Sequence, residues 1–242
     1  MKYAIISDVH GNLEALDAVL ARVAPDEELL CLGDVVGYGS QPNECVDRVR
    51  ARAAVCILGN HDVAAVDGYG LQYFNPYAKE AMAFTQRVLA PDRVAWLDGL
   101  AYEHRAPAFL LVHGAPIDYF TYILDNAGAQ RAFAATDARL IFVGHSHIAE
   151  YYEQAPGRRT IVHEHMQRGG ILRLRDGARY VINVGSVGQP RDLNPEASFA
   201  RYDAAEGSVV WERVPYAVAA AAGKIEAAGL PQWLAARLHD GR

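Results

Sequence analysis

The sequence predicts a mixed α/β fold in one domain that spans residues 1–242. Over the first sixty residues, short apolar runs suited to buried strands alternate with segments of helical periodicity, which is typical of βαβ units and a parallel sheet. Between residues 149 and 214 the pattern changes to successive strand-like segments, which favours antiparallel pairing. No repeat, low-complexity linker or composition shift marks a boundary between domains.

The N-terminal part supplies three expected strands and two expected helices. Leucine and valine recur at helical spacing after Asn12, whose side chain suits a helix N-cap. The second helix opens with Pro42, which is favoured in a first turn. The expected strands are 3–6, 28–33 and 54–59, and the expected helices are 12–24 and 42–53.

The rest of the chain continues with helices first and strands later. Residues 76–98 are expected to be helical, with a break or a second start at Pro91. The pair Asp176-Gly177 predicts a tight hairpin between two strands. Strands are also expected within 101–114 and at 139–144, and helices at 127–135 and in the alanine-rich 216–238.

Composition narrows the class of partner and the compartment. The net charge is −6 and the pI is about 5.8, so the surface as a whole would repel a nucleic-acid backbone. The three cysteines, Cys31, Cys45 and Cys56, cannot form a closed disulfide set, which favours a reducing intracellular compartment. The apolar run near the N-terminus is too short for a signal peptide or a membrane span, so we expect a cytoplasmic protein without a membrane partner.

Ligand-type side chains follow five of the predicted strands at the point where each strand ends. In open α/β sheets, ligands bind in the crevice outside these carboxyl ends, so we expect the side chains to lie together. Taken singly, such an aspartate or histidine is more often a cap or turn residue. The conjunction of five strand ends is what indicates a functional site. The residues are Asp8, His10, Asp34, Asn60, His61, Asp62, His113, His145 and His147.

Carboxylate oxygens and imidazole nitrogens together suit divalent ions such as Mn²⁺, Fe²⁺, Zn²⁺ or Co²⁺. Two such ions about 3.5–4 Å apart lower the pKa of a bridging water and screen the oxygens of a phosphoester during in-line attack. The pattern therefore predicts hydrolysis of a phosphate ester or anhydride. Within "VGHSHI", residues two apart on a strand share one side, so His145 and His147 could hold one ion or two.

In order and in type, these motifs resemble the full motif set of the calcineurin-like metallophosphoesterases. The resemblance runs from residue 4 to about residue 190. It implies a four-layer αββα sandwich, in which two mixed β-sheets are flanked by helices. The motifs are Asp8-x-His10, Gly33-Asp34, Gly59-Asn60-His61-Asp62, His113 and Gly144-His145-x-His147.

The resemblance also implies how two metal ions are held. Manganese is the expected metal, and iron, zinc, cobalt or nickel are the alternatives. One ion is implied to bind Asp8, His10 and His147, the other Asn60, His113 and His145, and Asp34 bridges the two.

The resemblance further implies that His61 does not coordinate the metals. It either protonates the leaving oxygen or stabilises its developing charge, a role suited to imidazole near neutral pH. Asp62 is a candidate partner that orients His61, and the alternative is a solvated turn carboxylate.

Two stretches, 33–46 and 182–192, resemble a bacterial and archaeal branch of small phosphodiesterases and diadenosine tetraphosphate hydrolases. Tyr38 stands where protein phosphatases carry a phosphate-clamping arginine, which makes a phosphoprotein substrate less expected. Arg191, in a glycine-rich loop, is a candidate for restoring that charge, and pairing with Asp192 is the alternative. Tyr38 and Arg191 are the candidate substrate-binding residues, with Asn43 and Tyr73 as weaker candidates.

His163 and His165 repeat the spacing of the metal motif in the middle of a predicted antiparallel strand. No ligand-type loop is tied to them by motif, so a solvent-facing strand or a contact between two copies is preferred to a third metal site.

The leading expectation is an enzyme that hydrolyses a small phosphorylated substrate, such as a phosphodiester or a dinucleoside polyphosphate. The alternatives are a non-catalytic interaction module on the same fold and a nuclease of the superfamily. Mutation of surface residues that abolishes partner binding would favour the first alternative, and salt-sensitive DNA cleavage the second. Assembly of the chain into a homo-oligomer is a further hypothesis.

Overall fold

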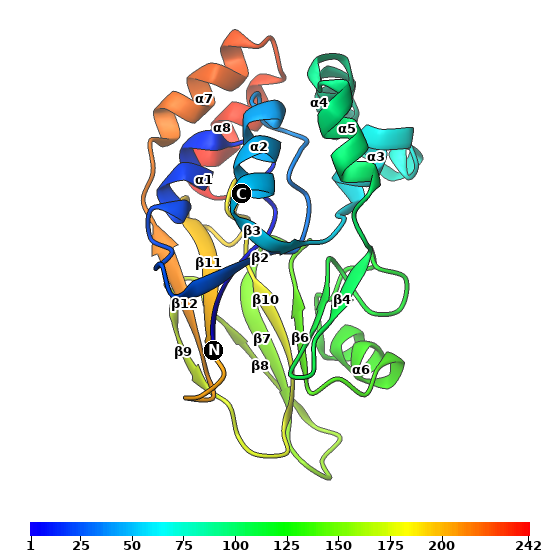
Figure 1. Cartoon of the computed structure of the whole chain (residues 1–242), viewed down its shortest axis with the longest axis vertical. Helices are drawn as coiled ribbons and strands as arrows, with labels where there is room; N and C mark the ends of the chain where they lie inside the picture. Colours follow the sequence, from blue (N-terminus) through cyan, green and yellow to red (C-terminus); the bar gives the residue numbers. More distant parts are fainter.

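Two six-stranded mixed sheets form the centre of the computed structural model, which describes residues 1–242 (Figure 1). The first sheet has the order β3 (Ala53–Cys56), β2 (Glu27–Cys31), β1 (Lys2–Ile6), β11 (Ala197–Asp203), β12 (Ser208–Val214) and β9 (Gly170–Arg173). The second has the order β4 (Glu103–Arg105), β5 (Leu110–Val112), β6 (Leu140–Val143), β10 (Arg179–Val184), β7 (Ala149–Gln154) and β8 (Ile161–His165).

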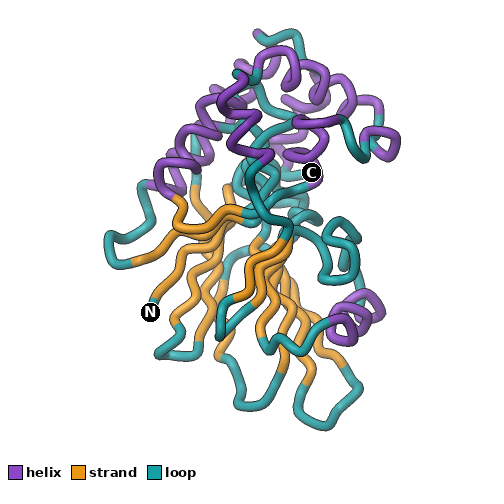
Figure 2. The backbone as a smooth tube through the Cα atoms, turned by 45° about the vertical axis from the view of Figure 1, so that its right-hand side comes forward, coloured by secondary structure: helices purple, strands orange, loops and turns teal.

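Most helices gather at one end of the molecule, whereas α6 stands apart beside the second sheet (Figures 1 and 2). A single 3₁₀ turn covers Leu71–Tyr73. The helices are α1 (Leu13–Leu20), α2 (Pro42–Arg52), α3 (Asn60–Asp67), α4 (Pro76–Val88), α5 (Pro91–Asp98), α6 (Asn126–Ala135), α7 (Val218–Ala227) and α8 (Gln232–Asp240).

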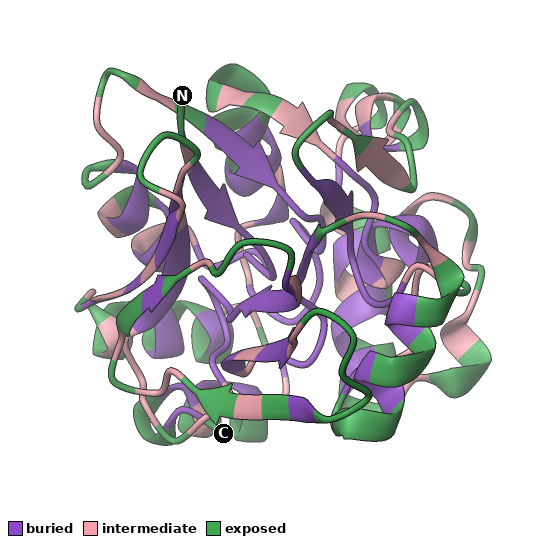
Figure 3. Cartoon of the chain, turned by 90° about the horizontal axis from the view of Figure 1, so that it is seen from below, coloured by how far each residue is buried: buried purple, intermediate pink, exposed green.

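Alternation along the strands divides the core into layers. In β1, Ala4 and Ile6 face the cluster beneath α1 and α2, while Ile5 faces the cluster between the two sheets. In β6, Phe142 faces the space between the sheets, and Ile141 packs toward α6. Both sheets therefore bury two faces along their central strands, and Figure 3 shows buried residues in these strands and in parts of the helices. This arrangement is the expected sandwich of two mixed sheets flanked by helices.

The strand pairings confirm the parallel beginning and the largely antiparallel end. β1 pairs in parallel with β2, and β2 with β3. β11 then joins the other side of β1 in antiparallel register, with Ile5 opposite Ala200. In the second sheet, β10 lies between β6, its parallel neighbour, and β7, its antiparallel neighbour. Segments late in the chain thus complete both sheets beside early strands.

Several local expectations are confirmed. The Asn12 side chain accepts a hydrogen bond from Ala15 N at 3.1 Å and caps α1. Pro42 begins α2, and the break at Pro91 separates α4 from α5. The accessible surface of 10286 Å² agrees with the value of about 10,600 Å² expected for a folded chain of this mass.

Three expectations need correction. Asp176-Gly177 is a turn with Gly177 at φ +71°, but it joins β9 of the first sheet to β10 of the second, so it forms no hairpin. The C-terminal helix is two helices, because Gly229 adopts a positive φ and Pro231 follows. The strand expected at 54–59 ends at Cys56, and the polar motif that follows it begins a helix, because α3 starts at Asn60.

The three cysteines are free. None of the helices combines the length and apolar character that crossing a membrane requires.

Candidate metal centre

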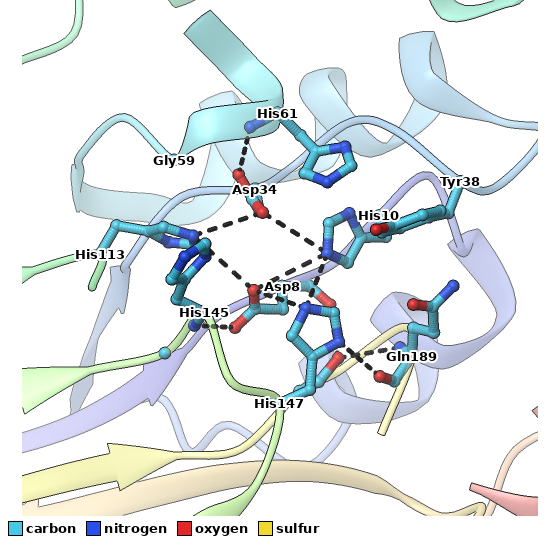
Figure 4. A network of polar contacts seen from close by, with 12 residues as sticks. Asp8, His10, Asp34, Tyr38, Gly59, His61, His113, His145, His147 and Gln189 are labelled. Carbon is cyan, nitrogen blue, oxygen red and sulfur yellow. Dashed lines mark hydrogen bonds and ion pairs between the residues drawn. The ribbon is translucent and has the colours of Figure 1, made fainter. Parts of the chain in front are cut away.

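The ends of β1, β2, β5 and β6 meet at one point, where aspartate and histidine side chains converge (Figure 4). Asp8 lies at the centre of the group, with Asp34 and His113 on one side and His10 and His147 on the other. The residues come from both sheets, so the site lies across the seam between them. Seven of the nine residues singled out from the sequence are at most 5% exposed and face this point or border it: Asp8, His10, Asp34, His61, His113, His145 and His147.

Three of these side chains form a first group around Asp8. Asp8 Oδ1 lies 3.2 Å from His147 Nε2 and 3.7 Å from His10 Nε2. The two Nε2 atoms are themselves 3.2 Å apart. Ligands on a tetrahedral ion with bonds of about 2.0–2.1 Å are separated by about 3.3 Å, so Asp8, His10 and His147 have the spacing of a ligand set.

A second group is formed by Asp34, His113 and His145. Asp34 Oδ2 lies 3.3 Å from His113 Nε2 and 3.6 Å from His10 Nε2. The same oxygen therefore faces both groups. The other oxygen, Oδ1, accepts a hydrogen bond from His61 N at 2.8 Å, which fixes the orientation of the carboxylate.

Backbone carbonyls orient three of the imidazoles. Nδ1 lies 3.0 Å from Val36 O in His10, 2.8 Å from Leu32 O in His113, and 2.6 Å from Gln189 O in His147. Each Nδ1 therefore carries a ring proton, and each Nε2 points to the centre. Nε2 of His10 and His147 presents a lone pair there, whereas His113 would first release its Nε2 proton to bind a metal.

Several of the atoms that face the centre have no hydrogen-bond partner. Asp8 Oδ1 and His113 Nε2 are buried without a hydrogen bond, and such groups are costly unless something binds them. Asn60 Oδ1, at the start of α3, is also buried and without a partner. Oxygen and imidazole nitrogen donors at this spacing fit divalent metal ions, which would satisfy all of these atoms together.

The backbone adopts positive φ angles at most of the candidate ligands. Eight non-glycine residues have a positive φ, and six of them lie at this site. Such a conformation is uncommon for these residues and persists only where the surrounding structure enforces it. The six are Asp8, His10, Asp34, Tyr38, His145 and His147, with φ between 50° and 65°.

Close contact between the sheets depends on Gly144, the residue after β6. A Cβ at this position would overlap Ser7 Oγ and lie 2.5 Å from Asp8 Oδ2. Without one, His145 N approaches Asp8 Oδ2 to 3.0 Å and donates a hydrogen bond to it. Gly144 thus allows the second sheet to position a ligand that belongs to the first.

Burial and mutual charge set the protonation of the ligands. Burial lowers the pKa of His10, His145 and His147, so these imidazoles are neutral and able to coordinate. Burial alone would raise the pKa of Asp8, but His147 and His113 hold it well below its usual range. His113 behaves differently, because Asp34 overcomes the effect of burial and raises the pKa of His113 to about 10.

His61 lies beside the ligands, and one of its ring nitrogens is within 4.8 Å of ligand atoms of His10 and Asp34. Its packing contacts differ from theirs. Its ring packs 4.8 Å from His10 and 4.5 Å from Tyr38, between ring centroids, and its Nδ1 has no hydrogen-bond partner. Burial lowers the pKa of His61 to about 4, although Asp34 opposes the shift. The side chain is therefore a neutral imidazole near pH 7.

Asp62 is not paired with His61. Its Oδ1 accepts hydrogen bonds from Val35 N at 2.9 Å and Val36 N at 3.2 Å, and its Oδ2 accepts one from Gly59 N at 3.1 Å. The residue is fully buried, so it is not a solvated turn carboxylate either. Asp62 instead holds the loop after β2 against the start of α3, which positions Asp34 and His61 indirectly.

The candidate substrate-binding residues lie together at the edge of the site. Arg191 Nη2 is 3.4 Å from Tyr38 Oη and 3.0 Å from Gln189 Oε1. Asp192 pairs with Arg213, so the alternative pairing of Arg191 with Asp192 is wrong. Arg237 of α8, which no motif in the sequence indicated, also reaches Gln189 Oε1, at 3.0 Å.

An aromatic cavity of about 430 Å³ opens beside the second ligand group. Tyr122 stacks on the His145 ring with centroids 3.7 Å apart, and Tyr73 is 86% exposed. Asn43 lies elsewhere, bonded to Val88 O and Ala90 N, so it joins helices and does not line the site. The sequence singled out only Asn60, His145 and Tyr73 among the lining residues, which also include Tyr69, Phe74, Phe120 and Tyr122.

The fold and the site together define a metal-dependent hydrolase of phosphate esters. The model of the calcineurin-like phosphoesterase superfamily domain matches residues 1–207. The chain belongs to the calcineurin-like phosphoesterase superfamily.

Individual relatives agree with this assignment. An uncharacterised protein of Methanocaldococcus jannaschii is 36% identical, over 99% of this chain and 98% of its own. A solved metallophosphoesterase from Sphaerobacter thermophilus is also 36% identical, with a TM-score of 0.91 and full coverage of both chains. A solved hypothetical protein from Pyrococcus horikoshii shares the fold at 17% identity, with a TM-score of 0.79 over 100% of this chain and 98% of the other.

Proposed function

We propose that this protein hydrolyses a small phosphodiester or a dinucleoside polyphosphate with two divalent metal ions, of which Mn²⁺ is the first candidate. Asp8, His10 and His147 would hold one ion, with Asp34 shared. The second would be held by Asn60, His113 and His145. Two ions at this site would supply a hydroxide nucleophile at neutral pH and screen the phosphoryl oxygens.

The observation that carries this proposal is the convergence of Nε2 atoms whose opposite ring nitrogens are held by carbonyl groups. A merely structural histidine cluster would use Nε2 in hydrogen bonds to protein groups. Here His10 Nε2 and His147 Nε2 face each other at 3.2 Å, and His113 Nε2 has no partner. A cation between these atoms would relieve the repulsion of their lone pairs.

His61 would act on the leaving oxygen. Since burial lowers the pKa of His61 to about 4, the imidazole is neutral before the reaction and offers an N–H group. A neutral donor stabilises the negative charge that develops on the leaving oxygen as the bond breaks. Of the two roles expected for His61, stabilisation of developing charge therefore fits better than transfer from an imidazolium.

Arg191 would bind the phosphate. Its positive charge contributes to lowering the pKa of His10, His61 and His147, so it acts directly on the centre. Its Nε is buried without a partner, which leaves a donor for an anionic oxygen. Tyr38, against which the guanidinium packs at 5.7 Å from the ring centroid, would hold it in place.

The aromatic cavity supports an organic group with a flat ring, such as a nucleobase. Tyr69 and Tyr73 expose 66% and 86% of their surface at its mouth. Exposed aromatic faces bind bases by stacking, at about 1–3 kcal/mol per base. This chemistry favours nucleotide-like diesters and anhydrides over simple phosphomonoesters.

A substrate screen with Mn²⁺ tests the proposal. It compares bis(p-nitrophenyl) phosphate, cyclic nucleotides, dinucleoside polyphosphates and p-nitrophenyl phosphate, with wild type, His61→Ala and His239→Ala. His239 is exposed on α8 and serves as a matched histidine control. We expect hydrolysis of diesters or dinucleoside polyphosphates by wild type and the control, with strongly reduced turnover in His61→Ala. Absence of metal-stimulated hydrolysis for every substrate would refute the proposal.

A further inference from the structure

A second set of metal-ligating side chains lies on the outer face of the second sheet. Glu150 projects from β7, and His163 and His165 project from β8, the outermost strand. Glu150 is directly opposite His165 in the antiparallel register, and Tyr152 is opposite His163. Because residues two apart share one face of a strand, all four side chains lie on the same face.

One carboxylate oxygen faces both imidazoles. Glu150 Oε2 lies 2.7 Å from His163 Nε2 and 3.3 Å from His165 Nδ1. Three ligand atoms on a tetrahedral zinc ion lie about 3.3 Å apart, since the bonds are about 2.0–2.1 Å long. Glu150 and His165 already have this separation, and His163 would move about 0.6 Å away from Glu150 to reach it.

Buried neighbours already support this arrangement. Glu150 is 2% exposed, and its other oxygen, Oε1, lies 3.3 Å from the hydroxyl of the fully buried Tyr152. The Tyr152 ring also stacks on the His163 ring, with centroids 4.2 Å apart. A hydrogen-bonded carboxylate and a packed imidazole are what holds ligands in place around bound metal ions.

The sequence favoured a solvent-facing strand or a contact between two copies over a metal site at His163 and His165, and the neighbouring carboxylate is an observation that it did not include. The sequence spacing identified His163 and His165 but not Glu150, which lies thirteen residues earlier on another strand. The side chain of His165 is 61% exposed, so one side of the cluster is open to solvent.

We propose that Glu150, His163 and His165 bind a divalent transition-metal ion, with zinc as the best match, at a third site separate from the catalytic centre. Two imidazoles and one carboxylate supply three ligands to a borderline cation, and water takes the open fourth position. The ion links β8 to β7. This stabilises β8, which is an edge strand and has no other neighbour in the sheet. The competing explanation is an ion pair between Glu150 and His163 without a metal.

Zinc binding to the purified full-length protein distinguishes the two. Metal-stripped wild type, His165→Ala and Glu164→Gln are dialysed against Zn²⁺, and bound zinc is counted by mass spectrometry. His165 is exposed, so its replacement should leave the fold intact. Glu164 is exposed on the same strand but points to the opposite face, so it is the matched control.

We expect His165→Ala to bind about one equivalent of zinc less than wild type, and Glu164→Gln to match wild type. In addition, Zn²⁺ should slow amide exchange of Ile161–His165 by about tenfold or more in wild type and not in His165→Ala. Equal zinc content in wild type and His165→Ala would overturn the proposal. Because the result is a difference in metal content, it does not depend on phosphoesterase activity.

Discussion

The catalytic centre and the Glu150–His163–His165 cluster use the same kinds of side chain but assemble them in opposite ways. At the centre, ligands follow the ends of strands from both sheets, and five of the candidate ligands have a positive φ. In the cluster, ligands project from two neighbouring strands in regular register. Backbone with positive φ angles lets ligands converge from several directions, whereas two regular neighbouring strands present their ligands from one side only.

This difference limits what each region can bind. Ligands from several directions enclose a volume, so the centre can surround bound metal and exclude most solvent. The cluster offers three ligands on one face and leaves His165 exposed, so it suits a single ion with an open position.

Asp34→Asn should nearly abolish activity, with kcat/KM lowered by at least about a thousandfold. Asp34 Oδ2 faces both ligand groups, and Asp34 Oδ1 accepts a hydrogen bond from His61 N. Loss of the carboxylate charge therefore weakens the binding of both ions and the positioning of His61. Kinetics with Mn²⁺ and metal analysis check the prediction. An active variant with full metal content would show that the two groups do not share Asp34.

His61→Ala should lower kcat by about a hundredfold or more and leave the metal content unchanged. The reason is that His61 contacts the rings of His10 and Tyr38 but provides none of the atoms in the two ligand groups described above. Metal analysis of the purified variant separates this role from ligation. If the variant loses metal, His61 belongs to the enclosed ligand set and the assigned roles must be exchanged.

Chelation of the metals should lower the Tm by about 10–30 °C. Each of the two ions, at a free concentration of 100 to 1,000 times its Kd, contributes about 3–4 kcal/mol, and each kcal/mol shifts the Tm of a chain of this size by about 2–4 °C. The effect is global because the centre joins both sheets. In metal-stripped protein, by contrast, His165→Ala should change the Tm by less than about 2 °C, since the His165 side chain is 61% exposed. Equal Tm shifts for chelation and for His165→Ala, measured by calorimetry, would contradict the difference between the two regions.

Tyr73→Ala should raise KM for nucleotide substrates about tenfold, because a stacking surface at the mouth of the cavity is lost. The kcat should stay within about twofold of wild type, since Tyr73 is far more exposed than any of the convergent aspartates and histidines. A phosphodiester with only methyl groups provides the control, and its KM should not change. A fall in kcat for both substrates would place Tyr73 in the chemistry instead.

Much of this organisation follows from local sequence. Apolar runs end in ligand-type residues at five strand ends, among them Gly33-Asp34 and Gly144-His145, so the edge where ligands collect was predictable. Strand alternation did not extend to His145 and His147, because both adopt a positive φ after β6 and their side chains enter different ligand groups. The rule that predicts shared faces holds only while the backbone stays extended.

The features that the sequence missed depend on distant strands. Asp176-Gly177 has the composition of a hairpin turn, but β9 and β10 find better partners in separate sheets. Glu150 meets His163 only through the register of β7 with β8. Arg237 reaches the site because α8 packs near Tyr38, and no local periodicity reports such long-range packing.

The position of the late strands has a consequence for synthesis on the ribosome. All seven candidate metal ligands have been made by residue 147, yet β10 inserts between β6 and β7, and β11 completes the pairing of β1. Gln189 O, which orients His147, also comes later. The nascent chain therefore carries its ligands before it has the scaffold to hold them. Metal acquisition should follow the emergence of about two hundred residues, when the last central strand closes the seam.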